Sequence, residues 1–174
     1  MTLPTMLIAT LPALLIAAAL FDLTTYTIPN VLPAGMLLLF VLFLLAMALV
    51  GHALHWNEVS PHLIAGGLGL AVGMAMFAAG WIGGGDAKLF AMASLWLGWD
   101  DMFSYAVIAS LLGGGLTLAL LMLRKVPLPK PLAKQVWLLH LADPKSGVPY
   151  GVALSIAALF ILPTTEIFRL AAAS

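Results

Sequence analysis

The sequence contains no cysteine and very few charged residues, and each shortage excludes a class of protein. Without cysteine there can be no disulfide, no thiolate metal site and no cysteine nucleophile. Charged residues make up only 8% of the 174 residues, whereas hydrophobic residues make up 63%. A water-facing domain normally carries roughly a quarter charged residues. The composition therefore predicts an integral membrane protein whose surface is largely covered by the lipid bilayer.

Neither charge sign is in excess, because the formal net charge is zero. The sequence thus gives no electrostatic argument for binding nucleic acid or acidic substrates. Residues 1–20 also lack Lys and Arg, whereas a cleaved secretory signal has a basic region ahead of its apolar run. We expect this first segment to stay in the protein as a membrane helix.

Long apolar runs are present, and they favour helices over a β-barrel. A hydrocarbon core of about 30 Å requires about 20 apolar residues per helix, and lipid cannot satisfy an open strand edge. The sequence predicts one all-α domain over residues 1–174, a polytopic membrane bundle of about six transmembrane helices. The expected apolar segments cover residues 3–21, 31–50, 63–82, 89–99, 102–123 and 148–162.

The fourth segment is too short to cross a bilayer unaided. Counted from Asp86 to Trp99, its helix reaches only about 21 Å at a rise of about 1.5 Å per residue. It can cross only where the bilayer is thin or where Asp86, which follows the run Gly83–Gly85, lies below the headgroups. Ionisable residues inside a membrane are costly and are candidates for function. Asp22 is a second such candidate, because the dipole opposes a negative charge at a helix C-terminus.

The topology predicts that these two acids share one face of the membrane. Five of the seven Lys and Arg residues lie between residues 124 and 147: Arg124, Lys125, Lys130, Lys134 and Lys145. The positive-inside rule sends this loop to the cytoplasm. Counting back across the segments places Asp86 and Asp22 on the cytoplasmic side and the N-terminus outside, with Arg169 as the exception. Two strong spans separate the two acids, so they share a side whether or not the fourth segment crosses.

Two neighbouring Asp side chains suit acid and base chemistry. Both cannot ionise cheaply within a few ångströms, so one keeps a proton. The ionised partner can then take a proton from water while the protonated one polarises a carbonyl, as in aspartic proteases. Plain structural interpretations stay open at this point: Asp86 can cap the fourth helix, and Asp22 can be a loop residue or pair with Lys88.

Three further patterns favour structure over chemistry. Residues 51–62 carry His52, His55, Glu58 and His62 at irregular spacing, which we interpret as a solvated loop, so we expect no bound metal and no cofactor. Small residues recur every fourth position at Ala65, Gly69 and Gly73, which predicts close approach of another helix. Residues 132–141 mix apolar and basic side chains and predict a short helix on the membrane surface.

Three motifs in order carry a family resemblance: Asp22 followed by Ile28-Pro29-Asn30, then Gly83-x-Gly85-Asp86-x-Lys88-Leu89, then Val148-Pro149-Tyr150-Gly151. Together they resemble the type IV prepilin leader peptidase family, the Gly-x-Gly-Asp membrane aspartic proteases, and within it the short tight-adherence-type members. The resemblance implies that Asp22 and Asp86 are the catalytic pair. It also implies residues that bind substrate or shape the site: Gly83, Gly85, Lys88, Pro29, Asn30, Pro149, Tyr150 and Gly151.

The implied substrate is a prepilin-like protein of a type IV pilus or secretion system, whose basic leader is cut at the cytoplasmic face of its apolar stalk. This places the protein in the cytoplasmic membrane as a multi-pass enzyme. Larger members carry a cytoplasmic domain with paired cysteines and methylate the new N-terminus. Cysteine is absent here, so neither zinc nor methyl transfer is expected. Residues 24–27 depart from relatives, which commonly have basic residues there.

Other functions share parts of this pattern. Preflagellin peptidases are related enzymes, and the three motifs do not exclude them. Presenilin-like intramembrane proteases also use Gly-x-Gly-Asp, but their first Asp typically follows Tyr, and here Phe21 precedes Asp22. A non-enzymatic alternative is a proton-coupled carrier or an assembly scaffold that uses the acids as relay or structural contacts.

Overall fold

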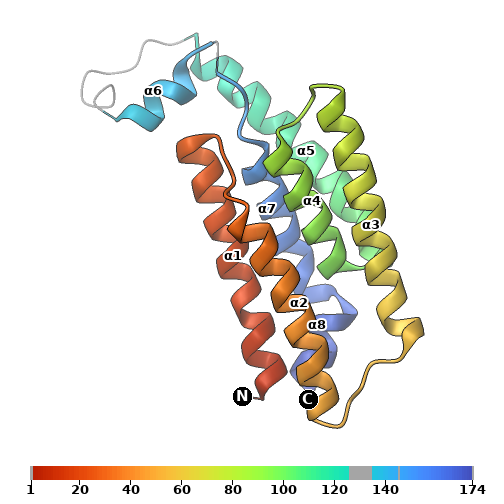
Figure 1. The fold of residues 1–174 in the computed structure, drawn as a ribbon. Helices are drawn as coiled ribbons and strands as arrows, with labels where there is room; N and C mark the ends of the chain where they lie inside the picture. The colour runs from red at the N-terminus through yellow and green to blue at the C-terminus, as the bar shows by residue number, and fades with distance from the viewer. Residues whose placement is uncertain (1, 126–134, 145, 174) are drawn as a thin grey trace.

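The protein is a bundle of helices in a computed structural model that describes residues 2–125, 135–144 and 146–173 (Figure 1). No strand occurs in these ranges, which confirms the all-α prediction. The elements are α1 (Leu3–Thr25), α2 (Val31–Leu49), α3 (Trp56–Ala78), α4 (Gly84–Leu97), α5 (Trp99–Leu123), α6 (Val136–Ala142), α7 (Tyr150–Ile161), the short 3-10 helix η2 (Leu162–Thr164) and α8 (Glu166–Ala173).

Four of these helices, α1, α2, α3 and α5, are long and apolar enough to cross a membrane. Their outward faces carry large apolar side chains, among them Phe103 at 78% and Leu111 at 71% exposure, which lipid can cover. The fourth predicted segment is short as expected, with 14 residues in α4, and α7 is also short, with 12. The polytopic helical bundle is therefore confirmed, with two helices that are too short to span a bilayer unaided.

The start of α3 corrects the prediction of a loop over residues 51–62. The helix begins at Trp56, and the Glu58 side chain accepts the His55 backbone N–H at 2.6 Å in a capping interaction that the sequence reading did not use. His62 consequently lies within α3, where its Nδ1 is 2.9 Å from the Leu95 carbonyl oxygen. Of the three histidines assigned to the loop, His55 is thus the N-cap residue of α3, and His62 packs from α3 against α4.

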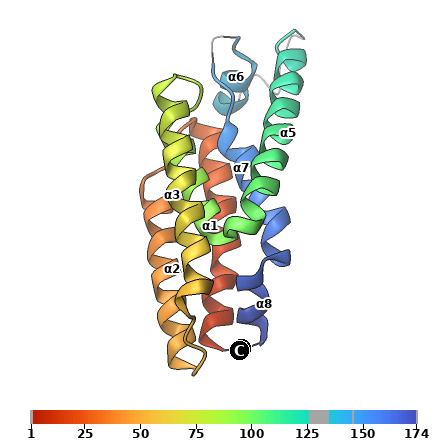
Figure 2. The ribbon, with the colours of Figure 1, turned by 90° about the vertical axis from the view of Figure 1, so that its right-hand side faces the viewer.

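The short helix α4 lies at the centre of the bundle and packs against α2, α3, α5 and α7 (Figures 1 and 2). Trp96 is fully buried, and its indole N–H donates to the Met36 carbonyl of α2 at 3.0 Å. The small face of α3 meets α4 as predicted, since a Cβ atom on Gly69 would lie 2.9 Å from Ser94 Oγ. Small residues thus let α3 approach the helix that carries Asp86.

We predict that Gly73→Ala destabilises the bundle. A Cβ atom on Gly73 would lie 3.0 Å from the Cα and carbonyl oxygen of Ala87, backbone atoms that cannot rotate away. Overpacking of this kind costs about 1 to 3 kcal/mol. Thermal unfolding in detergent should show a lower midpoint than for Gly67→Ala, a matched change in α3 with no atom within 4 Å of the added methyl. Equal midpoints for the two variants would contradict the close α3–α4 contact.

Two short helices complete the structure at opposite ends of the bundle. A short helix, α6, is present within the range predicted for a helix on the membrane surface, although residues 132–134 of that range, with Lys134, lie outside the described residues, as do Lys130 and Lys145. Figure 2 places α6 at the same end as the end of α5. The sequence reading did not predict α8, whose buried Ile167 and Ala171 join the core.

Candidate active site

Asp22 lies in the last turn of α1, and its carboxylate rests on the N-terminus of α7. The side chain is only 4% exposed, and its Oδ2 accepts the Gly151 backbone N–H at 2.6 Å. The first N–H groups of a helix have no partner within the helix, and they favour a negative charge. The unfavourable position of Asp22 at the end of its own helix is therefore offset by the start of another.

Asp86 lies in the first turn of α4 and is also buried, at 8% exposure. Its Oδ2 accepts the Gly83 N–H at 3.1 Å, so the capping interpretation is correct for one oxygen, although Asp86 caps from inside the helix and Gly83 is the N-cap residue. The other oxygen, Oδ1, is buried and has no hydrogen-bond partner among the described residues. Capping thus uses half of this carboxylate and leaves the other half available.

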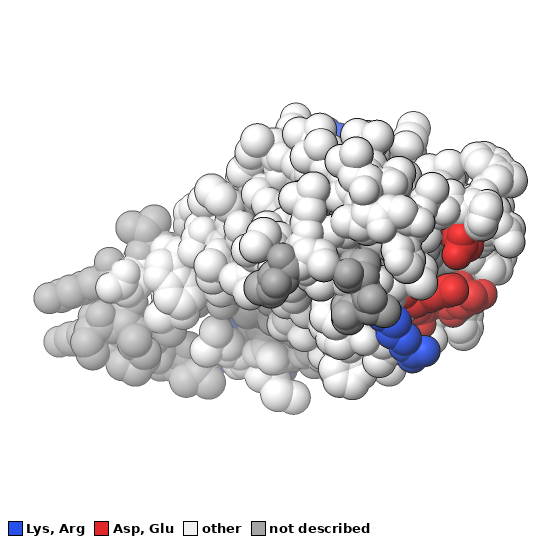
Figure 3. Space-filling view, turned by 90° about the horizontal axis from the view of Figure 1, so that it is seen from below, with Lys and Arg blue, Asp and Glu red and all other residues white. Residues whose placement is uncertain are grey.

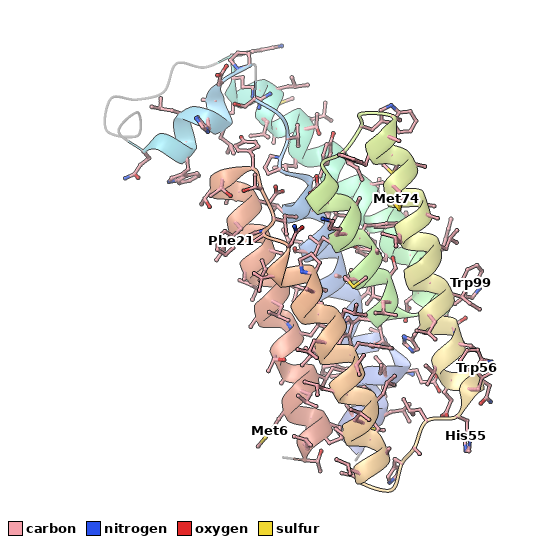
Figure 4. All side chains as sticks on the ribbon, in the orientation of Figure 1. Met6, Phe21, His55, Trp56, Met74 and Trp99 are labelled. Atoms are coloured by element: carbon pink, nitrogen blue, oxygen red, sulfur yellow. The ribbon has the colours of Figure 1, made fainter. Side chains whose placement is uncertain are left out.

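Three helices bring the two acids to one place, since α7 packs against both α1 and α4. The charges of Asp22 and Asp86 interact, and the Gly151 amide that donates to Asp22 also interacts with the Asp86 carboxylate. Phe21, next to Asp22, lies on the outer side of α1, which leaves the inner side to the acid (Figure 4). The structure thus groups Asp22, Asp86 and Gly151.

The glycines of the motifs make room for Ile28, a residue that the sequence reading did not single out. A Cβ atom on Gly85 would lie 3.0 Å from Ile28 Cβ, and one on Gly151 would lie 2.7 Å from Ile28 Cδ1. The buried Ile28 side chain therefore sits between the turn before α4 and the start of α7. Its place in the Ile28-Pro29-Asn30 motif was the sequence signal for this residue.

Lys88 binds Asn30 and not Asp22. Its Nζ donates to Asn30 Oδ1 at 2.7 Å, which ties the second motif to the first and corrects the alternative in which Lys88 pairs with Asp22. Pro29 lies just before α2, which begins at Val31, and its carbonyl accepts the Leu32 N–H at 3.0 Å. Both residues lie near the acids without touching either carboxylate through a described hydrogen bond.

Tyr150 faces an apolar groove between α3, α5 and α7. The groove has a volume of about 770 Å³, and Tyr150 and Phe90 form part of its wall, with Ala106, Ala109, Gly113 and Gly114 along α5. Gly113 lets the Tyr150 ring come close, since a Cβ atom there would lie 3.3 Å from Tyr150 Cδ1. Pro149, just before Tyr150, is buried. Tyr150 thus connects the groove wall to Gly151, the next residue, whose N–H donates to Asp22, although neither carboxylate lines the groove.

Within the described ranges, no three His, Asp or Glu side chains gather closely enough to hold a metal ion.

Arg124, at the end of α5, is a second residue whose contacts the sequence reading missed. Its guanidinium binds backbone carbonyls in the segment that leads to Gly151. In the sequence analysis, Arg124 was counted only as one of the five basic residues that place the loop in the cytoplasm.

The fold and site together define a polytopic helical membrane protein with a buried pair of carboxylates where three helices meet. The sequence model of the type IV leader peptidase family matches residues 9–118, more than half of the chain. The chain belongs to this family, and the family indicates a peptidase. The match includes Asp22 and Asp86 and ends before Arg124 and Gly151. No curated protein and no solved structure matches the chain significantly.

Proposed function

We propose that the protein is a membrane aspartic endopeptidase that cleaves the leader of prepilin-like proteins at the cytoplasmic face of the membrane, with Asp22 and Asp86 as its catalytic pair. The observation that carries this proposal is that both carboxylates are buried where α1, α4 and α7 meet, with Asp22 accepting the Gly151 N–H and interacting with the charge of Asp86. Membership of the type IV leader peptidase family supports the reaction class. The three motifs that resemble prepilin peptidases support the substrate class.

The two carboxylates divide the work of peptide hydrolysis. One is ionised and removes a proton from water, whose oxygen attacks the carbonyl carbon of the scissile bond. The other is protonated and donates its proton to the carbonyl oxygen as charge develops there. When the tetrahedral intermediate breaks, the C–N bond is cleaved, the leaving amine takes a proton from the pair, and a hydroxyl of the intermediate returns a proton to it, which restores the single shared proton. Burial of both side chains strengthens this coupling, because little water screens their charges.

The groove beside Tyr150 suits the apolar stalk of such a substrate. Its walls are almost entirely apolar, and small residues line the α5 side. Small residues let two membrane helices approach closely. A stalk helix in this groove would place the peptide bonds at its cytoplasmic end next to the carboxylate pair, where the leader begins.

The charge distribution supports the proposed orientation. Lys88, Arg124 and Lys125 lie toward the end of the bundle that holds the acids, which the positive-inside rule assigns to the cytoplasm. Figure 3 looks onto the opposite end, where acidic side chains gather at one edge next to a basic one. Asp101 at the start of α5 interacts with Asp100 and with Arg169 of α8. The site would therefore open to the cytoplasm.

Reconstituted protein and a purified prepilin-like substrate test the proposal. We expect one cut between the basic leader and the apolar stalk, seen as a shorter product whose new N-terminus is read by mass spectrometry. A matched substrate with its leader but without the apolar stalk should be cut poorly, because it cannot occupy the groove. Absence of any cut across a panel of prepilin-like substrates, with the protein inserted and folded, would refute the proposed function.

Filling the groove should weaken substrate binding more than catalysis. Gly114 lines the groove and has no atom within 4 Å of an added Cβ, so Gly114→Leu adds bulk there without a clash in the bundle. We expect KM to rise about tenfold with kcat little changed, since the lost binding is common to ground and transition states. Gly115→Leu is the control, because Gly115 is equally open but is not part of the groove wall. Equal KM values for the two variants would place the stalk elsewhere.

A further inference from the structure

Arg124 is the residue that caps the end of α5, and its guanidinium donates hydrogen bonds to three backbone carbonyls. Its Nε donates to the Leu141 carbonyl at 3.0 Å, and one terminal nitrogen donates to the Ser146 and Gly147 carbonyls at 3.0 and 2.8 Å. Hydrogen bonds from a charged donor are about twice as strong as neutral ones. One side chain therefore fixes the end of α6 and the start of the segment that follows it.

The segment held by Arg124 leads directly to the carboxylate site. Gly147 lies four residues before Gly151, whose N–H donates to Asp22, and residues 147–149 form no regular secondary structure ahead of α7. Irregular segments take their position from such side-chain contacts, because they have no ladder of backbone hydrogen bonds. The place where α7 begins, and hence the direction of the Gly151 N–H, depends on the anchor at Ser146 and Gly147.

Arg124 also lies beside the residue that ends α1. Tyr26 has a left-handed conformation with φ 55°, and its N–H donates to the Asp22 carbonyl at 2.9 Å. Burial raises the pKa of the Tyr26 hydroxyl, and the neighbouring Arg124 guanidinium acts against that rise. The guanidinium is thus close to both supports of Asp22: the end of its own helix and the segment that supplies its hydrogen-bond donor.

We propose that Arg124 is a positioning residue that sets the start of α7 against the end of α1, so that the Gly151 N–H meets Asp22. The role in cleavage rests on the proposed function, whereas the anchoring itself does not. Lysine cannot replace arginine here, because an ammonium is a point donor and cannot span three carbonyls in a planar fork. Nothing in the match to the leader peptidase family, which ends at residue 118, assigns this role.

The anchoring can be measured without any substrate. The chain has no cysteine, so Val148→Cys provides a single thiol within the held segment, where Val148 is only partly exposed. In Arg124→Gln we expect this thiol to react with a water-soluble maleimide about tenfold faster than in the parent, because a segment that loses three charged hydrogen bonds opens more often. Lys125→Gln, a change of the exposed neighbour, should leave the rate unchanged.

The effect on cleavage provides the second measurement. We expect Arg124→Gln to lower kcat about 10- to 100-fold with KM within about twofold, since misplacing a catalytic group by about 1 Å can cost that much. Arg124→Lys should lose nearly as much, and added methylguanidinium should partly restore Arg124→Ala. An unchanged labelling rate, or a loss confined to KM, would overturn the proposal. If the parent protein cuts no substrate, the proposed function fails, and the labelling rates alone decide whether Arg124 anchors the segment.

Discussion

Replacing either acid by its amide should abolish cleavage while leaving the fold intact. Asn has nearly the shape of Asp, so Asp22→Asn can still accept the Gly151 N–H, and Asp86→Asn can still cap α4 through its amide oxygen. Neither amide can exchange a proton with water or with a carbonyl at neutral pH. General acid or base catalysis contributes about 10²- to 10⁴-fold, and we expect each variant to lose at least that much of kcat.

Asp100→Asn is the matched control for these two changes. Asp100 is exposed and lies just beyond the far end of α4 from Asp86, so its charge is remote from the site. Cleavage of a prepilin-like substrate by this variant should equal that of the parent. The double variant of Asp22 and Asp86 should be no worse than either single one, because the pair acts as a unit. A single variant that keeps normal kcat would exclude the shared-proton mechanism.

Gly151→Ala should cause the second largest loss. A Cβ atom at this position would lie 2.8 Å from Asp22 Oδ2 and 2.7 Å from Ile28 Cδ1, closer than carbon atoms pack. The Ile28 side chain can turn aside, but the carboxylate can move only by leaving the amide that holds it. We expect kcat to fall about 10²-fold, in line with the cost of misplacing a reacting group.

A second substitution identifies which of the two contacts causes the loss. Ile28→Val removes the Cδ1 atom and leaves the clash with Asp22 in place, so it should not restore Gly151→Ala. Recovery of activity in the double variant would mean that packing against Ile28 is responsible and that the carboxylate is unaffected. Gly35→Ala serves as the control for adding a methyl group to a helical glycine, because no atom lies within 4 Å of the added methyl there.

Much of the fold followed from composition and the lengths of apolar runs. The short central helix was recognisable because its apolar run ends at Trp99, after too few residues to span a bilayer. The structure ends this helix, α4, at Leu97. The small face of α3 was recognisable from its period of four. The start of α3 was missed because His55 and Glu58 are polar, and polar residues at a helix cap resemble a loop. The helix α8 was missed because its eight residues are too few for a membrane signal.

The topology predicted which acids share a side of the membrane, but the side-chain partners around them depend on contacts between distant segments. An even number of strong spans between Asp22 and Asp86 already placed them on one side. The partners of Lys88 and Arg124 could not be deduced from spacing, because Asn30 is 58 residues from Lys88 and Gly147 is 23 residues from Arg124. Such contacts exist only after the helices have packed. The role of Ile28 depends likewise on two glycines in distant segments.

The bond between Gly151 and Asp22 joins residues that are 129 positions apart. During synthesis the ribosome delivers both acids long before it delivers the amide that holds one of them. Until the last apolar helix has been inserted, the acids lack the partner that fixes their arrangement. A nascent chain therefore carries both acids before the amide that holds Asp22, and the order of translation itself delays the assembly of this centre until α7 has been inserted.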